Sequence, residues 1–272
     1  MFSFAHMSTV IPTPVIPTIK TARIYRDGVD IIPPHPGSDW TRFVCISDTH
    51  SRTFRIPTGD VLLHAGDLSS WGSLSQLIIT VEWLKSLDHP VKIMIAGNHD
   101  LCLDKKWAQP IYGLLPEEVQ QARTYVRSQA AAGLHYIEHE PFRFMLPSGR
   151  EWKVYGSPAA PLYAQGSFQY ETTDEARVIY NRIPKDTDIL ITHTPPFMTL
   201  DTTSKGKHAG CHVLSNKLAE LRNCRLHVFG HIHECAGAQI NTDDPFRLVD
   251  CVSVNAAMAV TKKAIVVDLL NW

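Results

Sequence analysis

Five short stretches of the sequence contain residues of the types that bind divalent metals. In the first, Asp48 and His50 follow the apolar run 43–47 with one residue between them. Alternate side chains of an extended chain share a face, so a carboxylate and an imidazole at this spacing can hold one cation. Four later apolar runs end in similar blocks, which are Gly66-Asp67, Gly97-Asn98-His99-Asp100, Thr192-His193 and Gly230-His231-Ile232-His233. One block is weak evidence, but five together predict a two-metal phosphoesterase.

The elements that would position these blocks are those of a mixed α/β fold. Glycines 66, 97 and 230 directly precede ligand-type residues, which favours tight turns and close backbone approach. Sites in open α/β sheets lie beyond strand ends, where the blocks are predicted to converge. Apolar runs and turn residues predict strands at 42–47, 60–64, 91–96, 135–138, 142–146, 151–155, 188–192, 226–229, 248–255 and 264–269. Helical spacing and capping residues predict helices at 73–87, 116–132, 173–182 and 211–221.

The predicted architecture is a pair of packed sheets flanked by helices. Residues 1–40 contain six prolines and are predicted to form an N-terminal extension, in which 22–25 is a candidate edge strand. Residues 41–272 would form the catalytic domain, and in them 142–146 and 151–155 are predicted to pair as a hairpin.

Composition narrows the classes of partner and the compartment. The 26 basic and 27 acidic residues give a net charge of −1, so a broad basic surface for long nucleic acids is not expected. The six cysteines are scattered without a CxxC pair, which favours a reducing compartment. The N-terminus does not resemble a signal peptide, and no apolar run approaches the ~20 residues of a membrane span. We therefore expect a cytoplasmic enzyme without a membrane partner.

The order of the five blocks resembles the motif set of the calcineurin-like metallophosphoesterases, over residues 48–233. The stretch Ser47-Asp48-Thr49-His50-Ser51-Arg52 is also similar to the small MPPED-type subgroup of metallophosphoesterase-domain proteins. The resemblance implies a four-layer αββα fold with the metal site at strand ends. It also implies two sets of metal ligands, which are Asp48, His50 and His233 for one ion and Asn98, His193 and His231 for the other.

Asp67 would bridge the two ions in this scheme, lowering the repulsion between dications held ~3.5–4 Å apart. Two dications and two ionised carboxylates leave a positive site that attracts phosphate. Mixed nitrogen and oxygen ligands favour Mn, with Fe, Co, Ni or Zn as alternatives, over Mg or Ca. The resemblance further implies in-line attack on phosphorus by a metal-bridging hydroxide.

The remaining candidates would act on the substrate or behind the metal ligands. The resemblance implies that His99 faces the substrate and protonates the leaving oxygen or stabilises charge, and Asp100 is expected to orient it. Arg52 and His208 are weaker candidates for phosphate contact, with solvated loop residues as the alternative. His64 is expected to be a hydrogen-bonded residue behind the ligands. The tryptophans are interpreted as core or pocket-wall anchors rather than as a binding platform.

Several functions remain compatible with these residues. The resemblance favours a phosphodiesterase acting on small substrates, with cyclic nucleotides or other nucleotide diesters as the expected class. A phosphomonoesterase with the same metals is the main alternative, and a non-catalytic scaffold is a weaker one. The Asp-Arg-Gly sequence of phosphoprotein phosphatases is absent after Gly66, and so is the tyrosine ligand of purple acid phosphatases. The neutral net charge disfavours a nuclease for long DNA.

Overall fold

The computed structural model describes residues 21–26, 32–107, 113–241 and 249–272. Within these residues the strands form two six-stranded mixed sheets and a small two-stranded one. The first sheet, in spatial order, contains β1 (Ala22–Tyr25), β14 (Ile265–Leu270), β2 (Trp40–Ile46), β3 (Val61–Ala65), β4 (Val91–Ile95) and β5 (Leu134–Tyr136). The second contains β12 (Gly237–Asn241), β13 (Cys251–Asn255), β11 (Leu226–Phe229), β10 (Ile189–Thr192), β7 (Glu151–Ser157) and β6 (Glu140–Met145).

The central strands of both sheets are parallel. β2, β3, β4 and β5 run in one direction, and the edge strand β1 and its neighbour β14 complete the first sheet through antiparallel pairs. In the second sheet β13, β11, β10 and β7 are parallel, and β12 and β6 are antiparallel edges. The carboxyl ends of the parallel strands therefore share one edge in each sheet. The small sheet pairs β8 (Ala160–Pro161) with β9 (Gln169–Tyr170).

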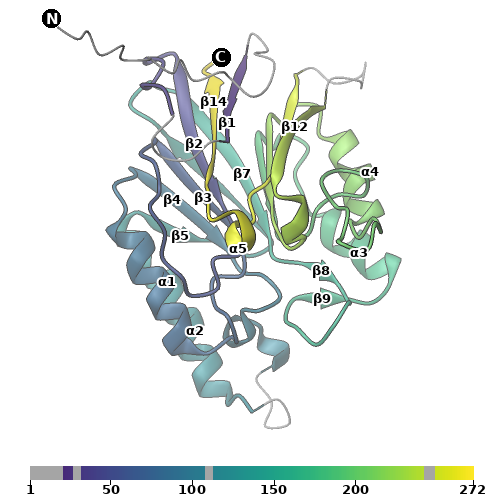
Figure 1. The fold of residues 1–272 in the computed structure, drawn as a ribbon. Coiled ribbons are helices and arrows are strands. Elements are labelled where there is room, and N and C mark those ends of the chain that lie inside the picture. Colours follow the sequence, from purple (N-terminus) through teal and green to yellow (C-terminus); the bar gives the residue numbers. More distant parts are fainter. Residues whose placement is uncertain (1–20, 27–31, 108–112, 242–248) are drawn as a thin grey trace, which may run out of the picture.

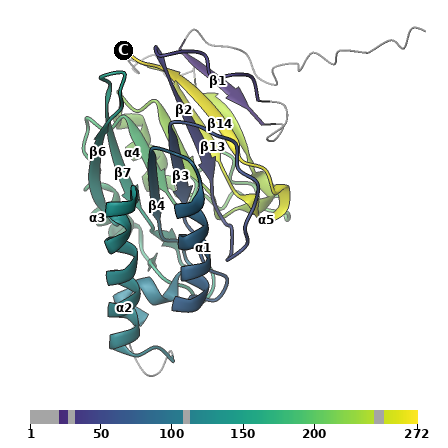
Figure 2. The same ribbon diagram turned by 90° about the vertical axis from the view of Figure 1, so that its left-hand side faces the viewer.

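Helices cover the outer faces of the two large sheets, which gives four layers (Figure 1). Figure 2 shows α1 and α2 lying across the outer face of the first sheet, where Val81 and Val126 pack with Leu62. On the other side, Tyr180 and Leu218 pack against the second sheet. The helices are α1 (Leu74–Ser86), α2 (Pro116–Ser128), α3 (Thr173–Tyr180), α4 (His212–Glu220) and the short α5 (Met258–Thr261).

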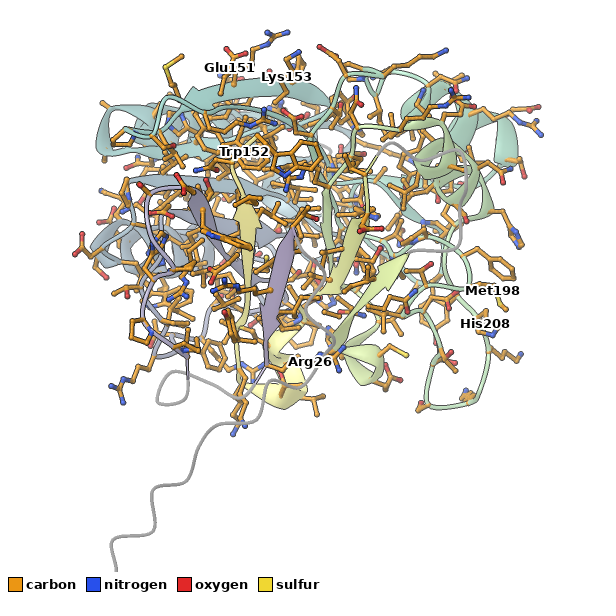
Figure 3. The ribbon with its side chains drawn as sticks, turned by 90° about the horizontal axis from the view of Figure 1, so that it is seen from above. Arg26, Glu151, Trp152, Lys153, Met198 and His208 are labelled. Atoms are coloured by element: carbon orange, nitrogen blue, oxygen red, sulfur yellow. The ribbon has the colours of Figure 1, made fainter. Side chains whose placement is uncertain are left out.

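The inner faces of the sheets meet in a hydrophobic core to which both contribute. Trp152 of β7 is fully buried and makes an edge contact with Phe43 of β2, with ring centroids 5.1 Å apart. Its neighbours Glu151 and Lys153 point outward (Figure 3), as the alternation of side chains along a strand requires. This core fixes the two sheets relative to each other. It thereby also positions the loops at the carboxyl ends of their strands.

The fold confirms the predicted α/β architecture, including the hairpin of β6 and β7 and the edge strand β1. The helix predicted to 132 ends as α2 at Ser128 and continues as a short 3-10 helix, Gln129–Ala132. The strand predicted from residue 248 begins at Cys251, and residue 248 lies outside the described residues. The division at residue 40 remains a prediction. In the described part of the chain, no helix has the length and apolar character needed to cross a membrane.

Candidate metal centre

The five sequence blocks come together where the parallel strands of the two sheets end. Asp48, Asp67 and Asn98 follow β2, β3 and β4 of the first sheet. His193 and His231 follow β10 and β11 of the second. The site is therefore formed by loops from both sheets, and its geometry depends on the packing of the core between them.

The first group of potential ligands consists of Asp48, His50, Asp67 and His233, whose donor atoms all lie within 4.8 Å of one another. His233 Nε2 is 3.1 Å from Asp48 Oδ1, and His50 Nε2 is 3.8 Å from Asp67 Oδ2. Two carboxylates and two imidazoles at these separations match the mixed oxygen and nitrogen ligands of divalent transition metals.

The second group is centred on the amide oxygen of Asn98. His231 Nδ1 lies 2.8 Å from Asn98 Oδ1, and His193 Nε2 lies 2.9 Å from the same atom. His193 Nδ1 donates its proton in a hydrogen bond of 2.9 Å to the carbonyl oxygen of Ala65. In the neutral ring, Nε2 is therefore unprotonated and carries a lone pair. Two lone pairs then face each other at hydrogen-bond distance without a proton between them. A cation resolves this conflict, so the donor set fits a divalent metal.

Asp67 lies between the two groups. Its Oδ1 is 3.4 Å from His193 Nε2 and accepts a hydrogen bond of 2.9 Å from the backbone N–H of His99. Its Oδ2 faces His50 of the first group. Burial raises the pKa of Asp67 well above its ordinary value, and the nearby carboxylates of Asp48 and Asp100 add to the effect. The carboxyl group is thus placed where two cations would favour its ionised form.

Burial favours, in three of the four imidazoles of the centre, the neutral form that metal binding requires, whereas the hydrogen bond to Asp48 raises the pKa of His233. Burial lowers the pKa of His50 to about 4 and that of His231 to about 3. Burial also lowers the pKa of His193. Asp48 behaves differently: although burial opposes its ionisation, the hydrogen bond from His233 lowers its pKa.

The backbone of the site differs from the extended conformation on which the first prediction was based. Asp48, His50, Asp67 and His231 all have left-handed φ angles, of 54°, 48°, 56° and 68°. Non-glycine residues in this region are strained, and such strain is concentrated at functional sites. The Asp48 and His50 side chains do meet, but through turns. His231 and His233 have the same two-residue spacing but do not face the same group, because His233 contacts Asp48 whereas His231 contacts Asn98.

Glycine is required where the loops approach most closely. A Cβ on Gly97 would lie 2.6 Å from His193 Cε1 and would also meet Asp67. A Cβ on Gly230 would overlap the carboxylate of Asp48 and the hydroxyl of Ser47. The predicted close approach at these glycines is therefore present, and it lets the ligand-bearing turns of both sheets touch.

His99 projects from the same loop as Asn98 without joining either ligand group. Its Nδ1 donates to the carbonyl oxygen of Ser70 at 2.7 Å, which leaves Nε2 for another partner. Its ring makes an edge contact with that of His50, with centroids 4.7 Å apart. His99 therefore lies beside the candidate metal centre, and its Nε2 takes no part in the hydrogen bond to Ser70.

Asp100 fixes the loop rather than the His99 ring. Its buried carboxylate accepts hydrogen bonds from the backbone N–H groups of Gly97, Leu68 and Ser69. The hydroxyl of Ser69 donates to it as well, at 2.7 Å. The expectation that Asp100 orients His99 directly is corrected by these contacts, since the ring is held by Ser70. Asp100 instead joins the turn after β3 to the turn after β4.

His64 is fully buried in β3 behind the ligand groups. Its Nδ1 accepts a hydrogen bond of 3.3 Å from the backbone N–H of Gly66. Nε2 therefore carries the proton and donates to the hydroxyl of Thr49 at 2.9 Å. This neutral imidazole joins the two turns that carry Asp48 and Asp67.

The buried His64 predicts an acid-sensitive fold. Burial lowers its pKa to about 3, whereas an unfolded chain gives about 6.5. Below about pH 6.5 the unfolded chain binds a proton that the folded protein does not, so stability falls as the pH drops toward 3. At about pH 4.5 the loss from this residue is about 3 kcal/mol.

The measurement is urea unfolding of the metal-free protein as a function of pH. His64→Gln can keep both hydrogen bonds, and should flatten the pH dependence by about one proton in this window. Parallel pH dependence in the two proteins would contradict the assignment.

Arg52 and His208 do not point into either ligand group. Arg52 is exposed, its guanidinium lies 5.7 Å from the Phe54 ring centroid, and it donates to the carbonyl oxygen of Ala259. His208 Nδ1 is 2.7 Å from the buried carboxylate of Asp201. Figure 3 shows His208 near Met198 at the edge of the molecule. Contact of either residue with phosphate remains a prediction that these partners do not support.

Sequence reasoning missed two residues that support the site. Ser70 accepts from His99 and donates its hydroxyl to the carbonyl oxygen of His50 at 2.6 Å. Ser167, which is fully buried, donates to the carbonyl oxygens of Gly97 and Asn98 at 2.9 and 3.1 Å. Ser167 lies about 70 positions from its partners, so no local pattern could have indicated it.

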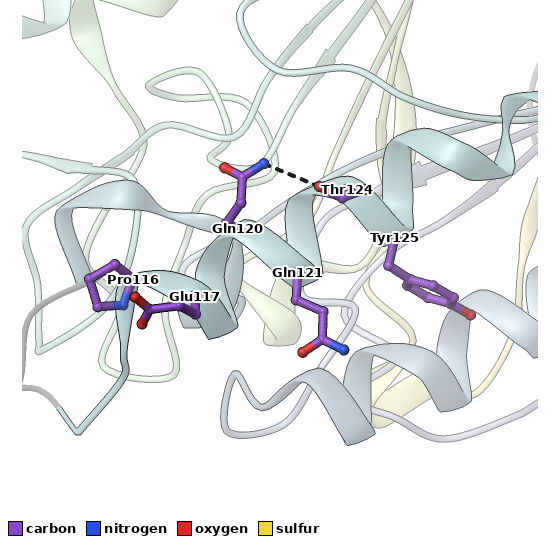
Figure 4. A pocket seen from close by; sticks show the side chains of 6 residues that line it. All are labelled: Pro116, Glu117, Gln120, Gln121, Thr124 and Tyr125. Atoms are coloured by element: carbon purple, nitrogen blue, oxygen red, sulfur yellow. Dashed lines mark hydrogen bonds between the residues drawn. The ribbon is translucent and has the colours of Figure 1, made fainter.

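A hollow of about 780 Å³ lies elsewhere, along the first turns of α2 (Figure 4). All of its lining residues come from one helix, and Gln120 donates to Thr124 within it. It lacks the convergent walls of a small-molecule site and holds none of the metal-binding candidates. The lining residues are Pro116, Glu117, Gln120, Gln121, Thr124 and Tyr125.

Comparison with known proteins agrees with this geometry. The family model for calcineurin-like phosphoesterases matches residues 41–235, which include all five blocks. Metallophosphoesterase domain-containing protein 1 of Homo sapiens is 36% identical to the chain, over 82% of the chain and 69% of that protein.

Two further comparisons bear on length and fold. The probable rhamnogalacturonate lyase C of Emericella nidulans is 38% identical over 80% of this chain, but the chain spans only 19% of that protein. Among solved structures, the TT1561 protein of Thermus thermophilus aligns with a TM-score of 0.50 and 13% identity, covering 79% of this chain and 88% of the other. At that identity the likeness shows the fold alone.

Proposed function

Because the chain belongs to the calcineurin-like phosphoesterase family, we propose that it is a metal-dependent phosphodiesterase acting on small diesters, with cyclic nucleotides as the substrate class. The family and the Asp/His cluster support a hydrolase with a binuclear divalent metal site. The observation that carries the proposal is the convergence of His193 and His231 on the amide oxygen of Asn98, with no proton between His193 Nε2 and that oxygen.

The proposed ligands form two sets that share Asp67. When bound, the two ions would act as Lewis acids toward the phosphoryl oxygens and lower the pKa of an attacking water. The nitrogen-rich donor set favours Mn, with Fe, Co, Ni or Zn as alternatives. The two sets are Asp48, His50 and His233 for one ion, and Asn98, His193 and His231 for the other.

His99 is the proposed proton donor. Its Nδ1 proton is committed to the carbonyl oxygen of Ser70, so a proton on Nε2 is the one available to the leaving oxygen. The edge contact with His50 keeps the ring beside the first ligand group. The ring can therefore protonate the leaving group without being a metal ligand.

A diester fits the surroundings better than a monoester. A monoester near neutral pH carries about two negative charges, whereas a diester carries one. Arg52, the cationic residue that follows the first block, instead lies over Phe54 and donates to Ala259. With these partners, Arg52 is not placed to pair with the second charge of a monoester.

The test is hydrolysis of bis-p-nitrophenyl phosphate and of p-nitrophenyl phosphate by the chelated protein after addition of single metals. We expect cleavage of the diester with Mn and little cleavage with Ca, because the ligands include several imidazoles. The 2′,3′- and 3′,5′-cyclic nucleotides would then be compared as substrates.

Preference for the monoester would replace the proposal with a phosphomonoesterase. No turnover with any metal, in protein shown to bind two ions per chain, would contradict hydrolysis of these diesters. Chelated protein without added metal is the matched control for contaminating phosphatases.

A further inference from the structure

Trp71 leaves most of its side chain in solvent beside the candidate metal centre. The residue is 78% exposed, and its ring centroid is 6.4 Å from that of His99. The two ring planes are inclined by 56°, so His99 does not stack on the indole. Trp152 fits the interpretation of tryptophans as core or pocket-wall anchors, whereas Trp71 is exposed and is not a core residue. An exposed indole at this position is suited to contact a ligand bound at the centre.

The backbone that carries Trp71 is fixed to the site on both sides. Ser70 is bonded to His99 and to His50, as described above. The N–H of Trp71 donates to Gln76 Oε1 at 2.8 Å, and the carbonyl oxygen of Gly72 accepts from Cys102 at 3.0 Å. The exposed indole is therefore presented from an anchored turn, so a ligand that stacks on it does not have to order the backbone.

A row of rings leads from the ligand groups to this indole. The centroids of His233 and His50 are 5.4 Å apart, those of His50 and His99 4.7 Å, and those of His99 and Trp71 6.4 Å. Trp71 is the exposed end of the row. A molecule whose phosphate lies at the metal centre and whose leaving group faces His99 would extend toward Trp71.

We propose that Trp71 stacks on a planar ring carried by the leaving group, and so selects nucleotide-type diesters over aliphatic ones. This inference rests on the proposed function, because it places the leaving oxygen at His99. In a nucleoside cyclic phosphate the leaving oxygen belongs to the sugar that carries the base. The base is then on the His99 side of the phosphate. Stacking of a base on an aromatic side chain typically contributes about 5- to 160-fold in affinity.

The test compares two five-membered cyclic diesters that differ in the base. Trp71→Ala should raise KM for 2′,3′-cyclic AMP about tenfold with little change in kcat, because stacking is equal in the ground and transition states. KM and kcat for glycerol 1,2-cyclic phosphate should stay within about twofold, since this substrate has no aromatic base to stack. Trp71→Phe should restore most of the loss.

Trp272→Ala is the matched control, since Trp272 is 54% exposed and its ring contacts Arg225 rather than the site. It should leave both substrates unchanged. Equal effects of Trp71→Ala on the two diesters, or no effect on either, would overturn the proposal.

A binding measurement separates this inference from the proposed function. Absence of hydrolysis with every metal would reject the proposed function. Calorimetric titration of AMP into the metal-loaded protein would then decide the role of Trp71. About tenfold weaker binding in Trp71→Ala would support stacking, whereas equal affinity, or no binding by the unchanged protein, would overturn it.

Discussion

Replacing Asp67 by asparagine is expected to lower the metal-dependent kcat/KM by about 1,000-fold or more. The carboxylate lies between the two ligand groups, with Oδ1 3.4 Å from His193 Nε2 and Oδ2 3.8 Å from His50 Nε2. An amide has one oxygen to offer and no charge, so it cannot lower the repulsion between two dications. Bound metal should fall from about two ions per chain to one or fewer, measured by mass spectrometry of the metals alongside initial rates.

Asparagine should preserve the fold in this experiment. Its side-chain oxygen can still accept from the backbone N–H of His99, which donates to Asp67 Oδ1 at 2.9 Å. Burial and neighbouring carboxylates raise the pKa of Asp67, so the metal-free protein loses no favourable charge on substitution. Its melting temperature should therefore match or exceed that of the unchanged protein.

Asp186→Asn is the matched control, because Asp186 is an exposed carboxylate that pairs with Lys153. It should keep full activity and full metal content. A folded Asp67→Asn protein that binds two ions and turns over at a near-normal rate would refute the two-metal scheme.

Secondary structure was predictable where local chemistry determines it. Ser73 accepts from the backbone N–H of Gln76 and begins α1, and Leu87 ends it, so the predicted limits 73–87 are the two caps. Thr172 likewise caps α3 together with Glu175. The strand β12, Gly237–Asn241, went unpredicted: Ala238 and Ile240 alternate with polar residues, but the run is short and depends on antiparallel pairing with β13.

The positions of the metal-binding candidates could be predicted, but their backbone could not. The left-handed turn at Asp48 is held by a hydrogen bond from its N–H to Gly66, and that at His50 by one to Asp67. These bonds join turns from neighbouring strands and leave no mark in the local sequence. For the same reason, the division of His231 and His233 between two groups followed from the resemblance and not from their spacing.

Replacing His99 by alanine is expected to lower kcat for a cyclic nucleotide by about 100- to 1,000-fold while metal content stays unchanged. The ring is not part of either ligand group, and its Nδ1 is held by Ser70, so Nε2 is the atom that would supply a proton. A sugar alkoxide is a poor leaving group and needs that proton. The p-nitrophenolate of bis-p-nitrophenyl phosphate leaves without one, so its hydrolysis should fall by about tenfold at most.

The dependence on the leaving group distinguishes proton donation from a structural role. His35→Ala is a suitable control, because His35 is an exposed histidine that contacts Asp60 outside the site. It should leave both substrates unaffected. Equal losses of the two substrates in His99→Ala would point to charge stabilisation or misplacement of the loop, since neither depends on the basicity of the departing oxygen. Loss of metal would show instead that His99 supports the ligand groups directly. Retention of the ions with selective loss of the cyclic nucleotide is the combination that only a proton donor at Nε2 produces.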